Sequence, residues 1–306
     1  MQAASSIFME ITFPISGVHT TLWLPPLVAF CVSFFTSMVG ISGAFLLLPF
    51  QMSVLGFVSP AVSGTNLIFN IVAAPGGIFG FLREKRIVWP VAWIVVAGSV
   101  PGIVIGGLIR LRCLPDPRHF KIFVGLVLLF IGIRLALDIR RDVIKANGQI
   151  ASINQPAQGV EDVNFSWRTL TYRFQNQNYS CSLPSIFGLS LLVGVLGGVY
   201  GIGGGAIIAP FLVAIYKLPI YTIAGATLIG TFATSVAGAG FYQFAAPFFP
   251  GMRVQPDWML GILFGLGGCC GTYAGARAQR YVSSRRLKLL MALLILFAAA
   301  NYLMVR

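Results

Sequence analysis

Charged side chains are scarce in this sequence. Asp, Glu, Lys and Arg together make up only 9% of the 306 residues, whereas 57% are hydrophobic, and soluble domains carry about 25% charged residues. So few charges cannot cover a soluble domain with a polar surface. We therefore expect an all-α polytopic membrane protein, whose backbone groups are paired internally within helices.

Carboxylates and imidazoles are missing from the middle of the apolar segments. The eight acidic residues and both histidines, His19 and His119, lie in predicted loops or at the edges of apolar segments. Intramembrane proteases of the aspartyl and HExxH types need such groups beside the scissile bond. We therefore expect no enzyme, and a proton relay through buried carboxylates is disfavoured.

Motifs for metals and cofactors are also lacking. None of the five cysteines forms a CxxC pair near histidines, so no zinc site is expected. The glycines of 201–205 are not followed by the Lys-Ser/Thr of a P-loop, and no strand precedes them. Residues 1–20 contain no Lys or Arg, which argues against a signal peptide. We expect no cofactor, and a first membrane segment that begins at Leu22.

Positive charge exceeds negative charge by 13. In a soluble protein this excess would indicate nucleic acid binding, but here Lys and Arg gather in the predicted loops. In that position they orient the chain in the bilayer and contact anionic lipid headgroups. The expected partner is therefore membrane lipid, with no nucleic acid.

An internal repeat organises the chain. Residues 39–50 (VGISGAFLLLPF) recur 161 residues later at 200–211 (YGIGGGAIIAPF). After a one-residue shift, Ser63-Gly64-Thr65 aligns with Gly225-Ala226-Thr227. Further on, three glycines at four-residue spacing occur in both halves: Gly98, Gly102 and Gly106, and Gly267, Gly271 and Gly275. This spacing is typical of close helix packing in membranes.

The repeat predicts the domain organisation. An N-terminal segment (1–21) precedes a first transmembrane repeat (22–138), and a polar linker (139–183) leads to a second repeat (184–306). Each repeat contains about five apolar segments. The first two segments of each repeat are shorter than the roughly 20 residues that a crossing helix needs. We expect either two short tilted crossings or broken, re-entrant helices.

Loop charges favour an inverted arrangement of the two repeats. If the first two segments form a hairpin, the Lys and Arg residues of 83–86, 140–173, 217 and 277–288 share one face, 14 in all. The opposite face carries six, from 110–121, Arg253 and Arg306. A parallel arrangement gives no such asymmetry. The positive-inside rule therefore places the linker in the cytoplasm, as a plain connection or along the bilayer surface, and both termini outside.

The two glycine-rich breaks are the candidate binding site, although packing explains them equally well. A half-helix that starts near Ala44 or Ala206 would present N–H groups with partial positive charge, which bind anions. Small polar side chains nearby would add donors, unless the hydroxyls bond their own helix carbonyls. The predicted substrate-binding residues are Ser42, Gly43, Ala44, Thr65, Asn66, Asn70, Gly203, Gly204, Gly205, Thr227, Thr231 and Ser235.

At these residues the chain resembles the sulfite exporter TauE/SafE family of membrane permeases. The resemblance rests on the duplicated break with its following Pro, on the 63–65 and 225–227 elements, and on the later glycine-rich spans. It implies a secondary transporter in the cytoplasmic membrane for sulfite, sulfonate, sulfoacetate or a related small anion. The alternative is a non-transporting membrane accessory protein. The coupling ion and the oligomeric state, a homo-oligomer included, stay open.

Overall fold

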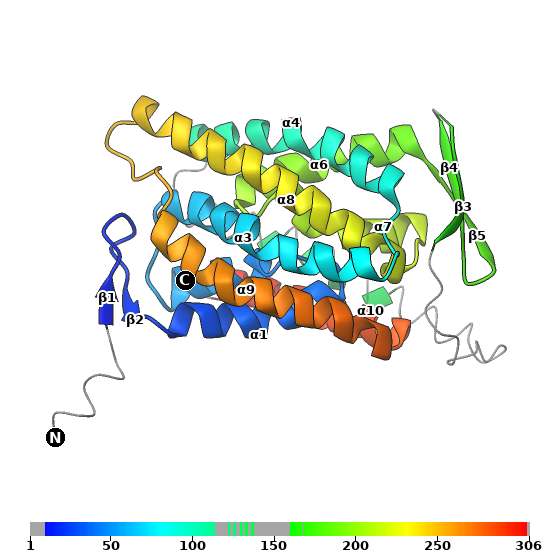
Figure 1. Ribbon diagram of the computed structural model, residues 1–306. Helices are drawn as coiled ribbons and strands as arrows, with labels where there is room; N and C mark the ends of the chain where they lie inside the picture. The colour runs from blue at the N-terminus through cyan, green and yellow to red at the C-terminus, as the bar shows by residue number, and fades with distance from the viewer. Residues whose placement is uncertain are drawn as a thin grey trace, which may run out of the picture.

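The computed structural model describes residues 10–113, 160–166 and 168–304, with scattered positions between 122 and 137. These residues are mostly helical, and their long helices run side by side in one bundle (Figure 1). The helices are α1 (Leu24–Met38), α2 (Ala44–Ser53), α3 (Ala61–Arg83), α4 (Trp89–Cys113), α6 (Leu183–Tyr200), α7 (Ile208–Tyr216), α8 (Ile220–Ala245), α9 (Trp258–Ala278) and α10 (Ser284–Met304). Short 3₁₀ helices are η2 (Gly204–Ile207), η3 (Ala246–Phe248) and η4 (Gln279–Tyr281).

Five of the described helices are long and apolar enough to cross a membrane: α3, α4, α6, α8 and α9. The prediction of a polytopic membrane protein is thereby confirmed. α1 and α2 contain only 15 and 10 residues and α7 contains 9, as expected for short first segments. α6, with 18 residues, is one of the five candidate crossing helices, which fits the expected alternative of a short crossing. The expected segment 119–138 lies largely outside the described residues.

Two small antiparallel sheets depart from the all-α prediction. β1 (Glu10–Thr12) pairs with β2 (His19–Thr21) before the first helix. The predicted polar linker contains β3 (Glu161–Phe165), β4 (Thr169–Phe174) and β5 (Gln177–Ser182) in that order. β4 alternates exposed and buried residues, because Leu170, Tyr172 and Phe174 face inward, as the period of a half-buried strand requires. The plain-linker interpretation is therefore wrong for this part of 139–183.

Hydrogen bonds between distant residues define the two ends of the bundle. At the β1–β2 end, Asp257 accepts a hydrogen bond from the Ser16 backbone (3.0 Å), and the Ala61 amide donates to the Arg253 carbonyl (2.8 Å). At the β3–β5 end, Tyr172 Oη and Thr222 Oγ1 are 3.0 Å apart. The same end holds the loop between α3 and α4 and the junction of α9 with α10 (Figure 1).

The chain direction follows from these ends. α1 starts at the β1–β2 end, and α2 leads back to it, so the two helices form a hairpin with the first break, Val39–Gly43, at its turn. α6 starts instead at the β3–β5 end, directly after β5. Opposite starting ends are what an inverted repeat requires. That the two halves are inverted copies of one another stays a prediction.

Glycine seams join each half to the other. α1 packs on α9, and α6 packs on α4. A Cβ added at Gly267 would lie 1.9 Å from the Pro26 carbonyl oxygen, and one at Gly106 would lie 2.1 Å from that of Val195. No side chain fits where two helix backbones approach so closely. The packing interpretation of the four-residue glycine spacing is therefore confirmed in both helices.

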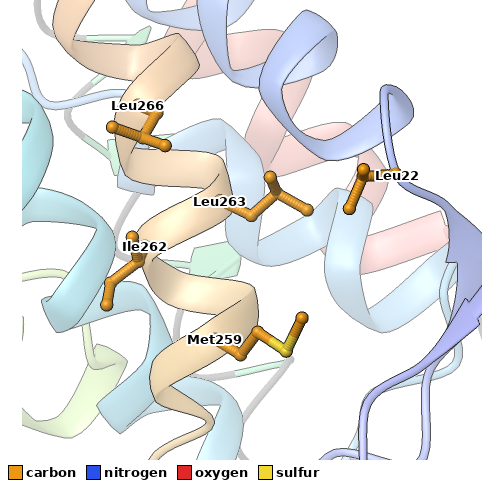
Figure 2. A pocket seen from close by; sticks show the side chains of 5 residues that line it. All are labelled: Leu22, Met259, Ile262, Leu263 and Leu266. Carbon is orange, nitrogen blue, oxygen red and sulfur yellow. The ribbon is translucent and has the colours of Figure 1, made fainter.

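The outer surface of the bundle is apolar. An open hollow lies between Leu22 and one face of α9, lined by Leu22, Met259, Ile262, Leu263 and Leu266 (Figure 2). All five lining side chains are apolar, which suits a lipid acyl chain and offers no donor to an anion. The hollow is thus unrelated to the predicted binding site.

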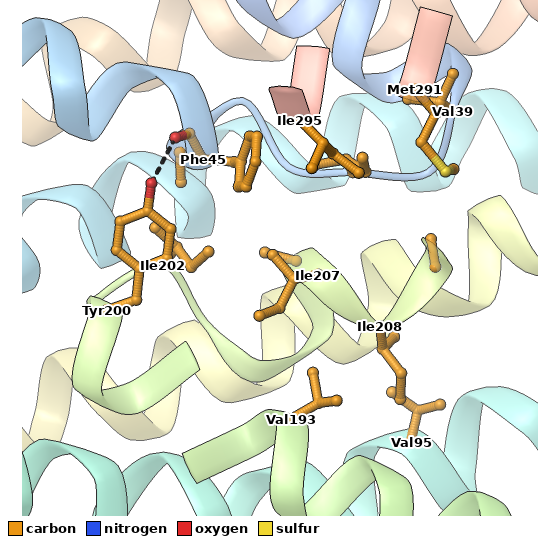
Figure 3. Close-up of a cluster of buried hydrophobic side chains, with 14 of the residues drawn as sticks. Val39, Phe45, Val95, Val193, Tyr200, Ile202, Ile207, Ile208, Met291 and Ile295 are labelled. Atoms are coloured by element: carbon orange, nitrogen blue, oxygen red, sulfur yellow. Dashed lines mark hydrogen bonds between the residues drawn. The ribbon is translucent and has the colours of Figure 1, made fainter. Parts of the chain in front are cut away.

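The largest hydrophobic cluster surrounds the two breaks. Val39, Ile202, Ile207 and Ile208 are at most 2% exposed, and Met291 and Ile295 of α10 cover the Val39 side (Figure 3). α10 contributes a stripe of buried residues at every fourth position, Leu287, Met291, Ile295 and Ala299, as one face of a helix does. The breaks therefore lie in the apolar centre of the bundle.

Candidate functional site

The first break is an extended turn between α1 and α2. Gly40 adopts a left-handed conformation (φ +71°), which glycine tolerates without strain. Thr227 Oγ1, from α8 of the other half, donates to the Gly40 carbonyl at 2.9 Å. Ser42 Oγ accepts from the Ala44 amide at 3.1 Å. The predicted free N–H group at Ala44 is therefore already capped by the chain itself.

The second break has a different local structure. Gly201 ends α6 in the left-handed conformation (φ +77°), and Gly203 follows with φ +85°. The 3₁₀ turn η2 comes next, in which the Ala206 amide donates to the Gly203 carbonyl at 3.1 Å. An α-helix starts only at Ile208. The helical segment after the second break therefore starts as a 3₁₀ turn at Gly204 and becomes α-helical at Ile208, close to the predicted start near Ala206.

Two asparagines of α3 join the two breaks. Asn66 Nδ2 donates to the Ala44 carbonyl at 2.9 Å and to the Gly201 carbonyl at 3.5 Å. Asn70 Nδ2 donates to the Ile202 carbonyl at 2.7 Å, and its Oδ1 accepts a short hydrogen bond from Ser42 Oγ. Each amide therefore contacts residues from both halves. The predicted convergence of Ser42, Asn66 and Asn70 at the breaks is what the structure shows.

The hydroxyl groups of α8 behave differently from one another. Thr231 Oγ1 donates to the Thr227 carbonyl of its own helix at 2.9 Å, in accordance with the local alternative. Ser235 Oγ is buried and has no hydrogen-bond partner among the described residues. A Cβ added at Gly203 would lie 3.0 Å from it. Ser235 therefore lies at the second break as a free donor.

Thr65 does not lie at either break. Its Oγ1 donates to the Ala61 carbonyl at 2.9 Å and accepts from the Asp257 amide at 2.8 Å. Both partners belong to the β1–β2 end of the bundle. The prediction was wrong for this residue. Thr65 and Asn66 are neighbours in sequence, but successive residues of a helix point in different directions, so only Asn66 reaches the breaks.

Gly43, Gly204 and Gly205 are packing positions. A Cβ at Gly204 would lie 2.7 Å from Gly194 Cα, and one at Gly205 would lie 2.1 Å from the Thr231 amide nitrogen. Gly204 is not among the glycines with a positive φ in the described residues. At Gly43 a Cβ would lie 2.6 Å from Ser33 Oγ. These glycines hold the breaks against α1, α6 and α8.

Sequence reasoning missed several polar groups at the breaks. Gln51 of α2 is fully buried, and its Nε2 donates to Asn66 Oδ1 at 3.5 Å, while its Oε1 has no partner among the described residues. An amide inside the apolar run 44–58 was the available signal. Tyr200 Oη donates to the Phe45 carbonyl at 2.9 Å and ties the two breaks together (Figure 3). Its position as the first residue of the repeated motif was the available signal.

The site is closed to solvent, and none of the predicted site residues carries a formal charge. Ser42 is 3% exposed, and the other predicted polar residues are 1% or less. Its chemistry is that of amide and hydroxyl groups, which offer hydrogen-bond donors without a counter-charge. Within the described part of the chain, no group of three His, Cys, Asp or Glu residues could hold a metal ion.

Comparisons with known proteins place the chain among membrane transporters. It is 21% identical over 268 residues to the probable membrane transporter protein YunE of Bacillus subtilis (strain 168), covering 85% of this chain and 89% of that protein. It is 21% identical over 277 residues to a probable membrane transporter protein of Xylella fastidiosa (strain 9a5c), covering 90% and 92%. No solved structure matches. The model of the family described as sulfite exporter TauE/SafE matches residues 26–302, so the chain belongs to this family of multi-pass membrane transporters.

Proposed function

We propose that this transporter moves a small anion through the point where the two breaks meet, and that the anion is sulfite, a sulfonate, sulfoacetate or a related organic anion. The family name supports this substrate class. The observation that carries the proposal is the position of Asn66 and Asn70, whose amide groups reach both breaks from one helix. An accessory role is less favoured, because both relatives are named transporters.

Anion binding would exchange one set of acceptors for another. In the closed conformation the Nδ2 groups of Asn66 and Asn70 donate to backbone carbonyls, and Ser42 donates to Asn70. A bound anion would accept from these donors in place of the carbonyls, joined by Ser235 Oγ. Hydrogen bonds to a charged acceptor are worth about 1.5–3 kcal/mol, against about 0.5–1.5 kcal/mol for neutral pairs. The exchange can therefore drive the breaks apart.

Reciprocal contacts between the halves support an alternating mechanism. Asn66 donates to the Gly201 carbonyl, and Thr227 donates to the Gly40 carbonyl. The acceptors Gly40 and Gly201 are equivalent positions of the repeated motif. The donors are one position out of register, since Thr227 aligns with Thr65 and not with Asn66. Each break is thus held by a helix of the opposite half. Opening one contact while closing the other would expose the site to one side of the membrane at a time.

The test is transport of labelled anions by the purified protein in vesicles. Wild-type protein should move at least one anion of a sulfite, sulfonate and carboxylate panel. Asn70→Ala removes the amide that bonds both breaks and should lower transport at least about tenfold, the equivalent of one charge-assisted hydrogen bond. Thr272→Ala is the control, because Thr272 Oγ1 makes a buried bond to the Ala73 carbonyl (2.7 Å) away from the breaks. It should reduce stability and leave transport per folded molecule unchanged.

Two outcomes would contradict the proposal. If no anion of the panel moves under any ion gradient, the protein is not an anion transporter of this class. If Asn70→Ala transports as well as Thr272→Ala per folded molecule, the substrate does not pass the asparagines.

A further inference from the structure

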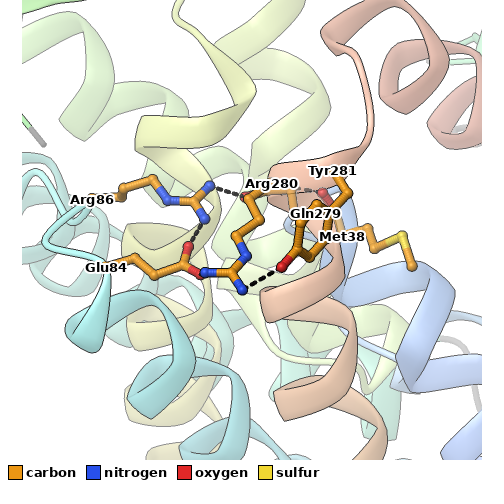
Figure 4. A network of polar contacts seen from close by, with 6 residues as sticks. All are labelled: Met38, Glu84, Arg86, Gln279, Arg280 and Tyr281. Atoms are coloured by element: carbon orange, nitrogen blue, oxygen red, sulfur yellow. Dashed lines mark hydrogen bonds and ion pairs between the residues drawn. The ribbon is translucent and has the colours of Figure 1, made fainter. Parts of the chain in front are cut away.

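A buried ionic cluster lies at the β3–β5 end of the bundle (Figure 4). Arg86, in the loop between α3 and α4, is only 1% exposed. Its guanidinium forms an ion pair with Glu84 and donates from Nη1 to Gln279 Oε1 at 3.0 Å. Arg280 also reaches the Glu84 carboxylate, at 3.8 Å. Two guanidinium groups therefore share one carboxylate.

The cluster has an excess of positive charge in a poorly solvated place. Burial lowers the pKa of Arg86 to about 10, with a smaller opposing effect of Tyr221 and a smaller lowering effect of Arg280. Arg86 Nε has no hydrogen-bond acceptor among the described residues. Buried charges are costly unless every donor is paired. The cluster therefore carries one unit of positive charge that the Glu84 carboxylate does not neutralise, and it attracts anions that can compete with Glu84.

The cluster is connected to the first break. Gln279, which accepts from Arg86, donates from Nε2 to the Met38 carbonyl at 2.7 Å (Figure 4). Met38 is the last residue of α1, and the break follows directly at Val39. A change at Arg86 therefore reaches the break through a single side chain, with no intermediate helix.

We propose that Arg86 is a second anion subsite, in which a small oxyanion takes the place of the Glu84 carboxylate on its way to or from the breaks. The carboxylate of Glu84 has the same chemistry as a carboxylate substrate and presents oxygens to a guanidinium as a sulfonate or sulfite would. A guanidinium binds such oxygens in pairs, which no lysine reproduces. The subsite rests on the proposed function, because it prepares the same anion for the central site.

The test compares equilibrium binding of sulfite and of acetate to the purified full-length protein with vesicle transport of the same anions. Glu84→Gln removes the internal competitor and should lower the sulfite Kd about tenfold, as expected for one charge-assisted hydrogen bond. Arg86→Gln removes the subsite and should raise the Kd at least about tenfold. Arg83→Gln is the control, because Arg83 is an exposed cation at the end of α3, close to the same loop, and lies over the Phe79 ring. It should keep the wild-type Kd.

If Glu84→Gln does not fold, the milder Glu84→Asp variant replaces it. The shorter side chain withdraws the carboxylate from Arg86 by one methylene group and should also lower the sulfite Kd. The subsite would be overturned if both Glu84 variants kept the wild-type Kd. It would also be overturned if Arg83→Gln and Arg86→Gln changed the Kd equally. If wild-type protein transports anions while these variants keep its Kd, the subsite alone fails. If wild-type protein moves no anion yet its binding depends on Arg86, the proposed function fails and the subsite stands.

Discussion

At the scale of single residues, Asn66 and Asn70 hold the centre of the molecule together. Leaving a buried amide or carbonyl without a partner costs about 1–3 kcal/mol. The broken helices create such carbonyls at Gly201 and Ile202, and the two asparagines satisfy them from α3. The breaks and the asparagines therefore depend on each other, which explains why costly amides are kept inside an apolar bundle.

Gly204 provides a prediction about packing. Gly204→Val would place its side chain against Gly194 Cα and Ser99 Cβ, 2.7 and 2.8 Å from the added Cβ. We expect the folded yield to fall as strongly as in Gly102→Val, where the added Cβ would lie 2.5 Å from the Leu191 carbonyl oxygen. Gly188→Val is the control, because nothing lies within 4 Å of its Cβ position. Size-exclusion chromatography in detergent measures the yield.

A high yield of folded Gly204→Val protein would contradict this expectation and would restore Gly204 as a direct part of the anion site. If Gly204 were part of the anion site, the valine side chain would cover the backbone N–H groups, and transport would be lost from protein that still folds. The structure favours the steric effect, because Gly204 packs against Gly194 of α6.

At the scale of elements, the β3–β5 sheet is attached to α8 and is not a free linker. Leu170, Tyr172 and Phe174 are at most 2% exposed, and Tyr172 bonds Thr222 near the start of α8. Burial raises the pKa of Tyr172 well above its ordinary value of 10.0. The same cause raises the pKa of Tyr179, and that of Cys181 to about 11.

These pKa shifts predict a loss of stability at alkaline pH. A tyrosine whose pKa is raised by folding stabilises the folded state fully below the unfolded pKa, and this contribution is lost as the pH rises through the folded pKa. The thermal midpoint of the wild type should therefore fall as the pH rises above about 10. At pH 8 the Tyr172→Phe variant should be less stable than the wild type by about 1 kcal/mol, because it lacks the hydrogen bond to Thr222. Its thermal midpoint should then fall less steeply than that of the wild type as the pH rises. The Tyr179 and Cys181 contributions remain in both proteins.

Thermal unfolding in detergent between pH 8 and pH 12 measures this effect. Parallel curves for the two proteins would show that Tyr172 ionises equally well in the folded and unfolded states, and would contradict the burial argument. Tyr281→Phe is a suitable control, because Tyr281 is 75% exposed.

At the scale of the whole molecule, the two ends differ in charge. Arg86, Gln279 and Arg280 meet at the β3–β5 end, so the loop 83–86 and the junction 277–281 lie on one face, as the charge argument required. Two of the counted cations are buried, however: Arg86 is 1% and Arg110 is 0% exposed. The charge asymmetry still predicts that the β3–β5 end lies in the cytoplasm.

Single cysteines in a Cys-less protein test this orientation. Gln177→Cys, at the start of β5, should resist a membrane-impermeant thiol reagent applied to intact cells. Gln255→Cys, before α9 at the β1–β2 end, should react. Both positions are exposed, so a difference in labelling reports the side of the membrane and not burial. Labelling of Gln177→Cys from outside would reverse the orientation.

The sequence by itself determined the features that depend on composition and local spacing. Low charge and long apolar runs required a helical membrane protein, and the duplicated glycine clusters marked the breaks, because three glycines cannot continue a membrane helix cheaply. The four-residue glycine spacing marked the seams of α4 and α9, since i and i+4 share a helix face. Asn66 and Asn70 stood out because buried amides need partners.

Only the tertiary structure decided which of these groups meet. Thr65 turned toward Asp257, Thr231 bonded its own helix, and Gln51, Tyr200 and Arg86 joined buried networks whose partners lie elsewhere in the chain. The β3–β5 sheet is tied to α8 by the hydrogen bond between Tyr172 and Thr222, which are 50 residues apart in the chain. Such outcomes depend on contacts between residues far apart in sequence, and no local pattern records which face of one helix packs against another.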